Sequence, residues 1–152
     1  LAATVFFGIQ NKPGTGGNPA DQTARHALPS MITPEVRNNL FDQFITAFNS
    51  RDLDAMYNML GPIAKAQVTK ETADKEFKKL IKFFHSVTGG AYTYSELTST
   101  HGSTTVYTLY YAVKFSEKSE IGRSGMLKIT IAVQGQTFQV YGLFLDGDTR
   151  NR

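Results

Sequence analysis

Three histidines and one short acidic stretch are the side chains of this sequence that could bind a metal. His26, His85 and His101 lie too far apart along the chain to form a pair with the spacing His-x-x-x-His. Asp146-Gly147-Asp148 resembles part of a calcium loop, but the remaining acidic positions and the terminal Glu are missing. The chain has no Cys, which excludes disulfides, thiol catalysis and Cys-ligated metals. We therefore expect no metal site and no cofactor.

Acid–base catalysis would need a titratable group that the fold shields from water. Asp42 falls on the polar face of a predicted helix, and Glu96 lies at the end of a predicted strand. His85 lies near a helix end, where a histidine can interact with the helix dipole, and His101 lies in a turn. No set of residues forms a catalytic constellation, so we predict no catalytic residue and favour a non-enzymatic protein.

The tyrosines are the most informative polar residues. Strand alternation places Tyr107 and Tyr111 on the inner face of a predicted sheet and Tyr110 on the outer face. If the inner face encloses a pocket, it would be lined by Phe44, Tyr107 and Tyr111, whose hydroxyls could orient an apolar ligand. If the outer face is uncovered, an amphipathic interface would form from Tyr92, Tyr94, Tyr110 and Tyr141. Ordinary aromatic pairing between strands is the alternative to such an interface.

Helical signals occupy the first half of the predicted domain. Thr33-Pro34 is typical of a helix start, and an apolar stripe continues to about Asn49. A second helix, Leu53–Leu60, is capped by Asp52 and ends at Gly61-Pro62, before a helical turn at Ile63–Val68. Thr69 starts a third helix, which we expect to end before Gly89-Gly90.

The second half changes to the two-residue period of strands. We predict four strands, joined by short turns and one loop into an antiparallel meander: Ala91–Thr98, Thr104–Phe115, Met126–Gln134 and Thr137–Leu145. The expected fold is α+β, with three N-terminal helices packed on a curved four-stranded antiparallel sheet. We divide the chain into an apolar segment (1–10), a linker and lead-in (11–32), the α+β domain (33–146) and a polar tail (147–152).

Three stretches resemble the nuclear transport factor two-like superfamily, in particular its small exported bacterial domains. They are F-x-x-F-I-T-A-F-N-S-R-D-L-D-A-M-Y-N-M-L-G-P (Phe41 to Pro62), V-T-K-E-T-A-D-K-E-F-K-K-L (Val68 to Leu80) and F-Q-V-Y-G-L-F-L (Phe138 to Leu145). The resemblance implies a cone-shaped domain over about Thr33–Leu145, and members of the superfamily commonly pair through the outer sheet face. This fold hosts many unrelated roles, so the resemblance assigns no reaction.

The N-terminal segment Leu1–Ile9 decides the expected location. It is apolar but about half the length needed to cross a bilayer. It is either the end of a signal or membrane anchor, or a β-prone segment packed on the domain, as a cytoplasmic protein would require. The Gly- and Pro-rich linker after it makes a tether the simpler interpretation.

The sequence is therefore compatible with two functions. The first is a non-enzymatic protein-interaction domain of the bacterial cell envelope, tethered through residues 1–9 and forming a homo-oligomer or binding a protein partner. The alternative is a binder of a small apolar ligand, or an enzyme, that uses the pocket of the cone. A net charge of +3 over 152 residues is too weak to predict a nucleic-acid partner.

Overall fold

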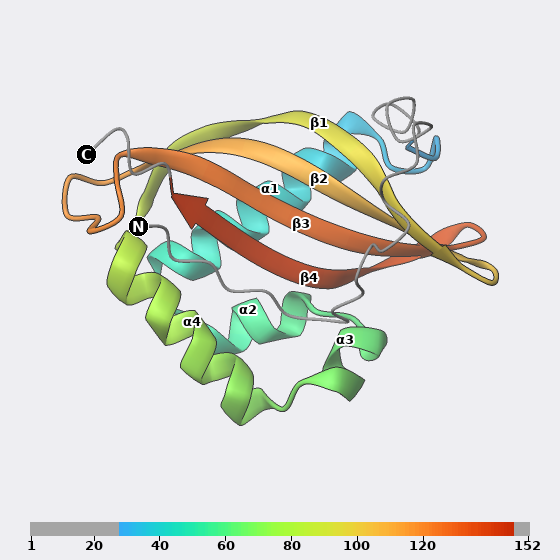
Figure 1. Cartoon of the computed structure of the whole chain (residues 1–152), viewed down its shortest axis with the longest axis horizontal. Helices are drawn as coiled ribbons and strands as arrows, with labels where there is room; N and C mark the ends of the chain where they lie inside the picture. The colour runs from blue at the N-terminus through green and yellow to red at the C-terminus, as the bar shows by residue number, and fades with distance from the viewer. Residues whose placement is uncertain (1–27, 148–152) are drawn as a thin grey trace.

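The computed structural model describes residues 28–147, which form four helices followed by a four-stranded antiparallel sheet (Figure 1). The helices are α1 (Pro34–Asn49), α2 (Leu53–Met59), α3 (Pro62–Gln67) and α4 (Lys70–Phe84). The strands are β1 (Val87–His101), β2 (Thr104–Phe115), β3 (Ser124–Gln134) and β4 (Thr137–Gly147), and they lie in sequence order across the sheet. The predicted α+β class and the antiparallel meander are confirmed.

Three of the helices begin at the residues that the sequence indicates. Thr33, Asp52 and Thr69 each accept a hydrogen bond from the backbone N–H three residues later, at 3.2, 3.0 and 3.1 Å. These side chains satisfy N–H groups that have no partner inside the helix. The helical turn expected at Ile63–Val68 is the short helix α3.

The junction between α4 and β1 differs from the prediction. α4 ends at Phe84, because His85 adopts a positive φ of 66°, and β1 already begins at Val87. Gly89 and Gly90, expected to follow the helix end, therefore lie within the strand. A Cβ on Gly90 would meet the Ala112 carbonyl oxygen at 2.4 Å, so this glycine permits a close approach of β1 to β2.

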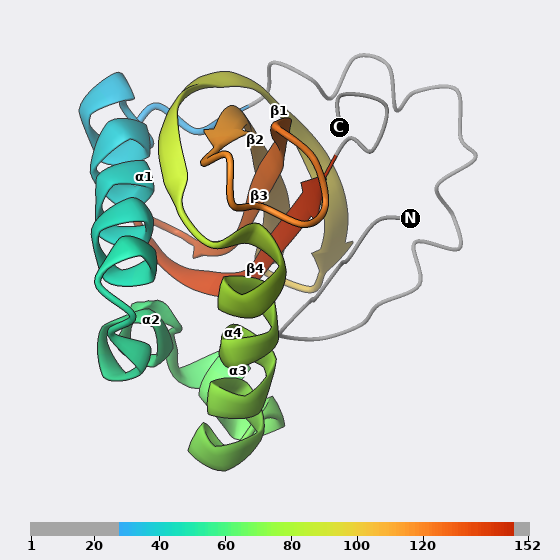
Figure 2. The same cartoon turned by 90° about the vertical axis from the view of Figure 1, so that its left-hand side faces the viewer.

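The sheet has an inner face that packs against the helices and an outer face turned away from them (Figure 2). The inner face and the helices share one apolar core, which includes Phe44, Phe48, Met56, Phe77, Leu80 and Phe84. Six inward strand residues predicted from the alternation are all buried: Leu109, Val113, Leu127, Ile129, Ile131 and Val133. Asn49 connects the end of α1 to β1 through two 2.9 Å hydrogen bonds with the backbone of Val87.

The free edge of β4 is covered in part by the chain between α2 and α3. Leu60 forms a parallel bridge with Val140, and the N–H of Gly61 donates to the Val140 carbonyl at 2.9 Å. The Gln139 side chain accepts a hydrogen bond from the N–H of Ile63 at 2.8 Å. These contacts occupy backbone groups that another strand could otherwise pair with.

We predict that Gly90→Ala lowers the free energy of unfolding by about 1–3 kcal/mol, because the added methyl group meets the Ala112 carbonyl. Gly89→Ala is the matched control, since a Cβ at Gly89 meets nothing within 4 Å. Urea unfolding of both variants measures the difference. Equal stability of the two variants would contradict the close approach of β1 to β2.

Candidate functional site

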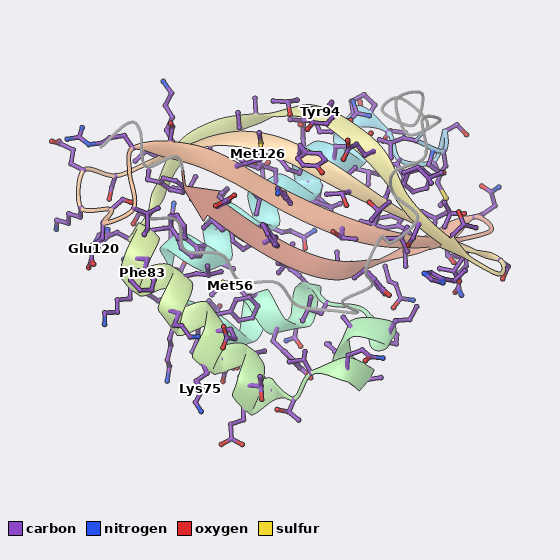
Figure 3. All side chains as sticks on the ribbon, in the orientation of Figure 1. Met56, Lys75, Phe83, Tyr94, Glu120 and Met126 are labelled. Carbon is purple, nitrogen blue, oxygen red and sulfur yellow. The ribbon has the colours of Figure 1, made fainter. Side chains whose placement is uncertain are left out.

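One row of side chains crosses the outer face of all four strands. Tyr94, Tyr110, Lys128 and Phe144 are successive cross-strand neighbours. The rings of Tyr94 and Tyr110 are stacked, with centroids 4.4 Å apart and an angle of 10° between the planes. The Lys128 ammonium lies 5.7 Å from the Tyr110 ring centroid and 4.5 Å from that of Phe144. We call these four residues the outer-face row; Figure 3 views this face and labels Tyr94.

Polar groups beside the outer-face row fix its geometry. The Tyr110 hydroxyl donates to a carboxylate oxygen of Glu96 at 2.7 Å. The hydroxyls of Thr98 and Thr108 are 2.7 Å apart, and those of Thr108 and Thr130 are 3.4 Å apart. This hydroxyl chain links β1, β2 and β3 on the outer face. The row is therefore held by side-chain hydrogen bonds as well as by the sheet.

A second apolar cluster occupies another part of the outer face. Val106, Ala132 and Tyr141 are 1–5 % exposed, and Ile63 of α3 packs against them. Tyr141 lies at an irregularity of the β3–β4 register, between the paired positions of Val140 and Gly142. Burial raises the pKa of the Tyr141 hydroxyl. Tyr141 is thus on the outer face, as predicted, but in this cluster and not in the outer-face row.

Tyr92 lies on the inner face, whereas the sequence pattern groups it with the outer tyrosines. It is the cross-strand neighbour of Tyr111, and the two rings pack edge to face with centroids 5.7 Å apart. The cause is a register shift between Tyr92 and Tyr94, which adds one residue to β1 and interrupts the alternation. Tyr92 and Tyr94 therefore lie on opposite faces although they are two residues apart.

The three side chains predicted to line an inner pocket belong to the apolar core. Phe44 and Tyr111 have no exposed surface, and Tyr107 is 8 % exposed. Phe44 stacks on Phe48 and Tyr111 stacks on Phe41, with ring centroids 5.4 and 5.1 Å apart. The Tyr111 hydroxyl donates to the Arg37 carbonyl at 2.8 Å. Two cavities that described residues form are lined by other side chains.

The histidines and acidic residues do not converge in the described part of the chain. His85 caps the C-terminus of α4, and its Nδ1 lies 3.3 Å from the hydroxyls of both Ser86 and Ser116. His101 is the last residue of β1, whereas His26 and Asp148 lie outside the described residues. Within residues 28–147, no group of His, Asp and Glu side chains could hold a metal ion.

No family model and no curated protein matches this chain. Across residues 28–147, no helix combines the length and apolarity needed to span a bilayer. The apolar segment 1–10 lies outside the described residues. The function is therefore inferred from the fold and from the outer face of the sheet.

We predict that the stability of the protein decreases as the pH rises above 10.0, the ordinary pKa of tyrosine. Burial, with a smaller contribution from nearby Tyr92, raises the pKa of Tyr111 in the folded state. The folded protein therefore holds this proton more tightly than the unfolded chain, and the stabilisation is complete below the unfolded pKa and lost above it. Urea unfolding on both sides of pH 10.0 measures the decrease. Tyr111→Phe should make it smaller; an unchanged decrease would contradict this assignment.

Proposed function

We propose that this chain is a non-enzymatic protein-interaction domain that self-associates through the outer face of its sheet. The observation that carries the proposal is the outer-face row, which places three aromatic rings and one lysine in register across four strands. Aromatic side chains supply large contact areas at interfaces, and tyrosine combines an apolar ring with a hydrogen-bonding hydroxyl. The two long helices, α1 and α4, pack on the inner face. The outer-face row therefore lies on the opposite side of the sheet from them.

A second copy of the chain is the partner that the charges of this face fit best. The outer face carries Lys128 on β3 and Glu96 on β1, on either side of β2. A two-fold axis along β2 would lay β1 of one copy over β3 of the other. Each Lys128 would then approach the Glu96 of the other copy, so the same face would complement itself. A different protein partner would have to match both charges independently.

The same proposal extends to family and location. We assign the chain to the nuclear transport factor two-like superfamily as a cone-shaped domain of the bacterial cell envelope, tethered through Leu1–Ile9. The order of helices before a four-stranded antiparallel meander supports the family, together with the three stretches that resemble it. The apolar Leu1–Ile9 followed by a Gly- and Pro-rich segment supports a tether.

We predict that Tyr110→Glu weakens self-association while the domain stays folded. The new carboxylate would lie beside Glu96 and would place a second negative charge at the centre of the interface. Sedimentation equilibrium measures the mass, and thermal unfolding reports whether the domain is intact. Gln136→Glu, which adds the same charge in the exposed β3–β4 turn, is the control. A Tyr110→Glu variant with the wild-type mass would contradict the proposed interface.

A charge exchange tests the two-fold arrangement. Lys128→Glu should weaken self-association, because it places two acidic groups opposite each other, and adding Glu96→Lys in the same chain should restore it. Sedimentation equilibrium of both single variants and the double variant measures this effect. If the double variant associates no better than either single variant, Lys128 and Glu96 do not meet across the interface.

Membrane and soluble fractions of the cells that make the protein test the tether. We predict that the protein is found in the membrane fraction and that removal of residues 1–9 releases it. Immunodetection in both fractions is the measurement. Finding the wild-type protein in the soluble fraction would contradict the tether. That result would not bear on the sheet interface, which the Tyr110→Glu and charge-exchange experiments test.

A further inference from the structure

The exposed side of α4 carries four lysines. Lys75, Lys78, Lys79 and Lys82 follow the spacing i, i+3, i+4 and i+7, which places them on one side of a helix. All four are exposed, and Figure 3 shows Lys75 on the side of α4 away from the sheet. We call these four lysines the lysine stripe. The opposite side of α4 lies in the apolar core and buries Ala73, Phe77, Leu80 and Phe84.

The charge of the lysine stripe is only partly neutralised. Of the salt bridges found among the described residues, one involves the stripe, in which Lys79 pairs with Glu76 at 3.2 Å. Lys70, earlier in α4, by contrast has two carboxylate partners, each at 2.7 Å. Residues 75–82 contain four lysines and one glutamate. The stripe therefore concentrates positive charge on one side of α4.

The lysines of the stripe repel one another, because like charges three or four residues apart destabilise a helix. The partial negative charge of the helix C-terminus stabilises cations within the last turn, which contains Lys82 but not the other three lysines. Exposed acidic residues lie near the two ends of the stripe: Glu71 one turn before Lys75, and Glu120, whose N–H donates to the Phe83 carbonyl at 2.8 Å. A negatively charged partner along the stripe would offset the remaining repulsion.

The chemistry of the stripe favours a lipid surface over a partner that binds with a defined geometry. All four cations are lysines and none is an arginine, the residue that binds phosphates and carboxylates through two parallel hydrogen bonds. Neither of the two cavities that described residues form is lined by α4. Lysine ammonium groups on flexible stems are attracted to anionic headgroups without a fixed geometry. A row of exposed lysines therefore matches the surface of an anionic bilayer.

We infer that the lysine stripe lies against the anionic phospholipid headgroups of a bilayer and orients the domain on it. The inference rests on the proposed tether, which brings the domain to a membrane, and it adds which helix faces the lipid. Each lysine near an anionic bilayer contributes roughly fivefold in affinity, so four lysines together bind far more tightly than one. Because α4 packs on the inner face of the sheet, the contact does not use the outer-face row.

A fluorescent label on α4 tests this contact in the complete chain. The chain has no Cys, so Thr72→Cys gives one attachment point for an environment-sensitive dye, at an exposed position three residues before Lys75. We expect a blue shift of the emission with vesicles of equal parts phosphatidylcholine and phosphatidylglycerol, and none with phosphatidylcholine alone. The shift should disappear in about 1 M salt, where the Debye length is about 3 Å. No shift with the mixed vesicles, an equal shift with phosphatidylcholine, or a shift that persists in salt would overturn the inference.

Removal of charge separates the stripe from the other cations of the chain. Lys75→Gln combined with Lys78→Gln in the labelled chain should raise the lipid concentration at half-maximal shift at least about tenfold. Lys114→Gln combined with Arg123→Gln removes the same charge from exposed positions of β2 and of the β2–β3 loop, and should leave that concentration nearly unchanged. Thermal unfolding verifies that both variants are folded. An unchanged lipid concentration in the first variant, or an equal increase in the second, would contradict the assigned surface.

Two comparisons separate this contact from the tether and from an acidic protein partner. Co-sedimentation with phosphatidylcholine vesicles reports membrane binding by Leu1–Ile9, which requires no anionic lipid. A chain that sediments with these vesicles but shows no shift with the mixed vesicles would support the tether and overturn the lipid contact of α4. Poly-glutamate represents an acidic protein. A half-maximal shift at a lower concentration of negative charge with poly-glutamate than with the mixed vesicles would overturn the choice of a lipid surface.

Discussion

The structure depends on the burial of one face of a four-stranded sheet against the helices. Side chains of a strand point to either face of a sheet, so the strand residues that do not point to the helices lie on the outer face. The inner half joins the rings of Phe44, Phe48, Phe77 and Phe84 in one apolar core. The two long helices, α1 and α4, pack on the inner face, so neither of them covers the outer face. The interface that we propose follows from this one-sided packing.

Local chemistry made much of the fold predictable. A Thr or Asp before a helix accepts hydrogen bonds from residues only three positions away, so Thr33, Asp52 and Thr69 identify helix starts without any knowledge of the tertiary structure. The alternation of large apolar residues along β2 and β3, which pair without a register shift, likewise identifies the side of each strand that faces the helices. The start of β1 was missed, because the role of Gly90 depends on a carbonyl oxygen of another strand.

The sites were less predictable than the fold because they depend on strand register. One additional residue between Tyr92 and Tyr94 moves these tyrosines to opposite faces, and no local pattern reveals it. The outer-face row likewise exists only because Tyr94, Tyr110, Lys128 and Phe144 come into register across four strands. A sequence pattern could identify Tyr110 as an outward tyrosine but not its neighbours.

The irregularity of β1 gives its two faces different aromatic contacts. On its inner side, Tyr92 supports the guanidinium of Arg37, and on its outer side, Tyr94 stacks on Tyr110. Self-association of the unmodified protein tests the central claim most directly. Sedimentation equilibrium of the wild-type chain over a range of concentrations should give a dimer, with twice the monomer mass of 16.8 kDa. A monomer throughout that range would contradict self-association through the outer face.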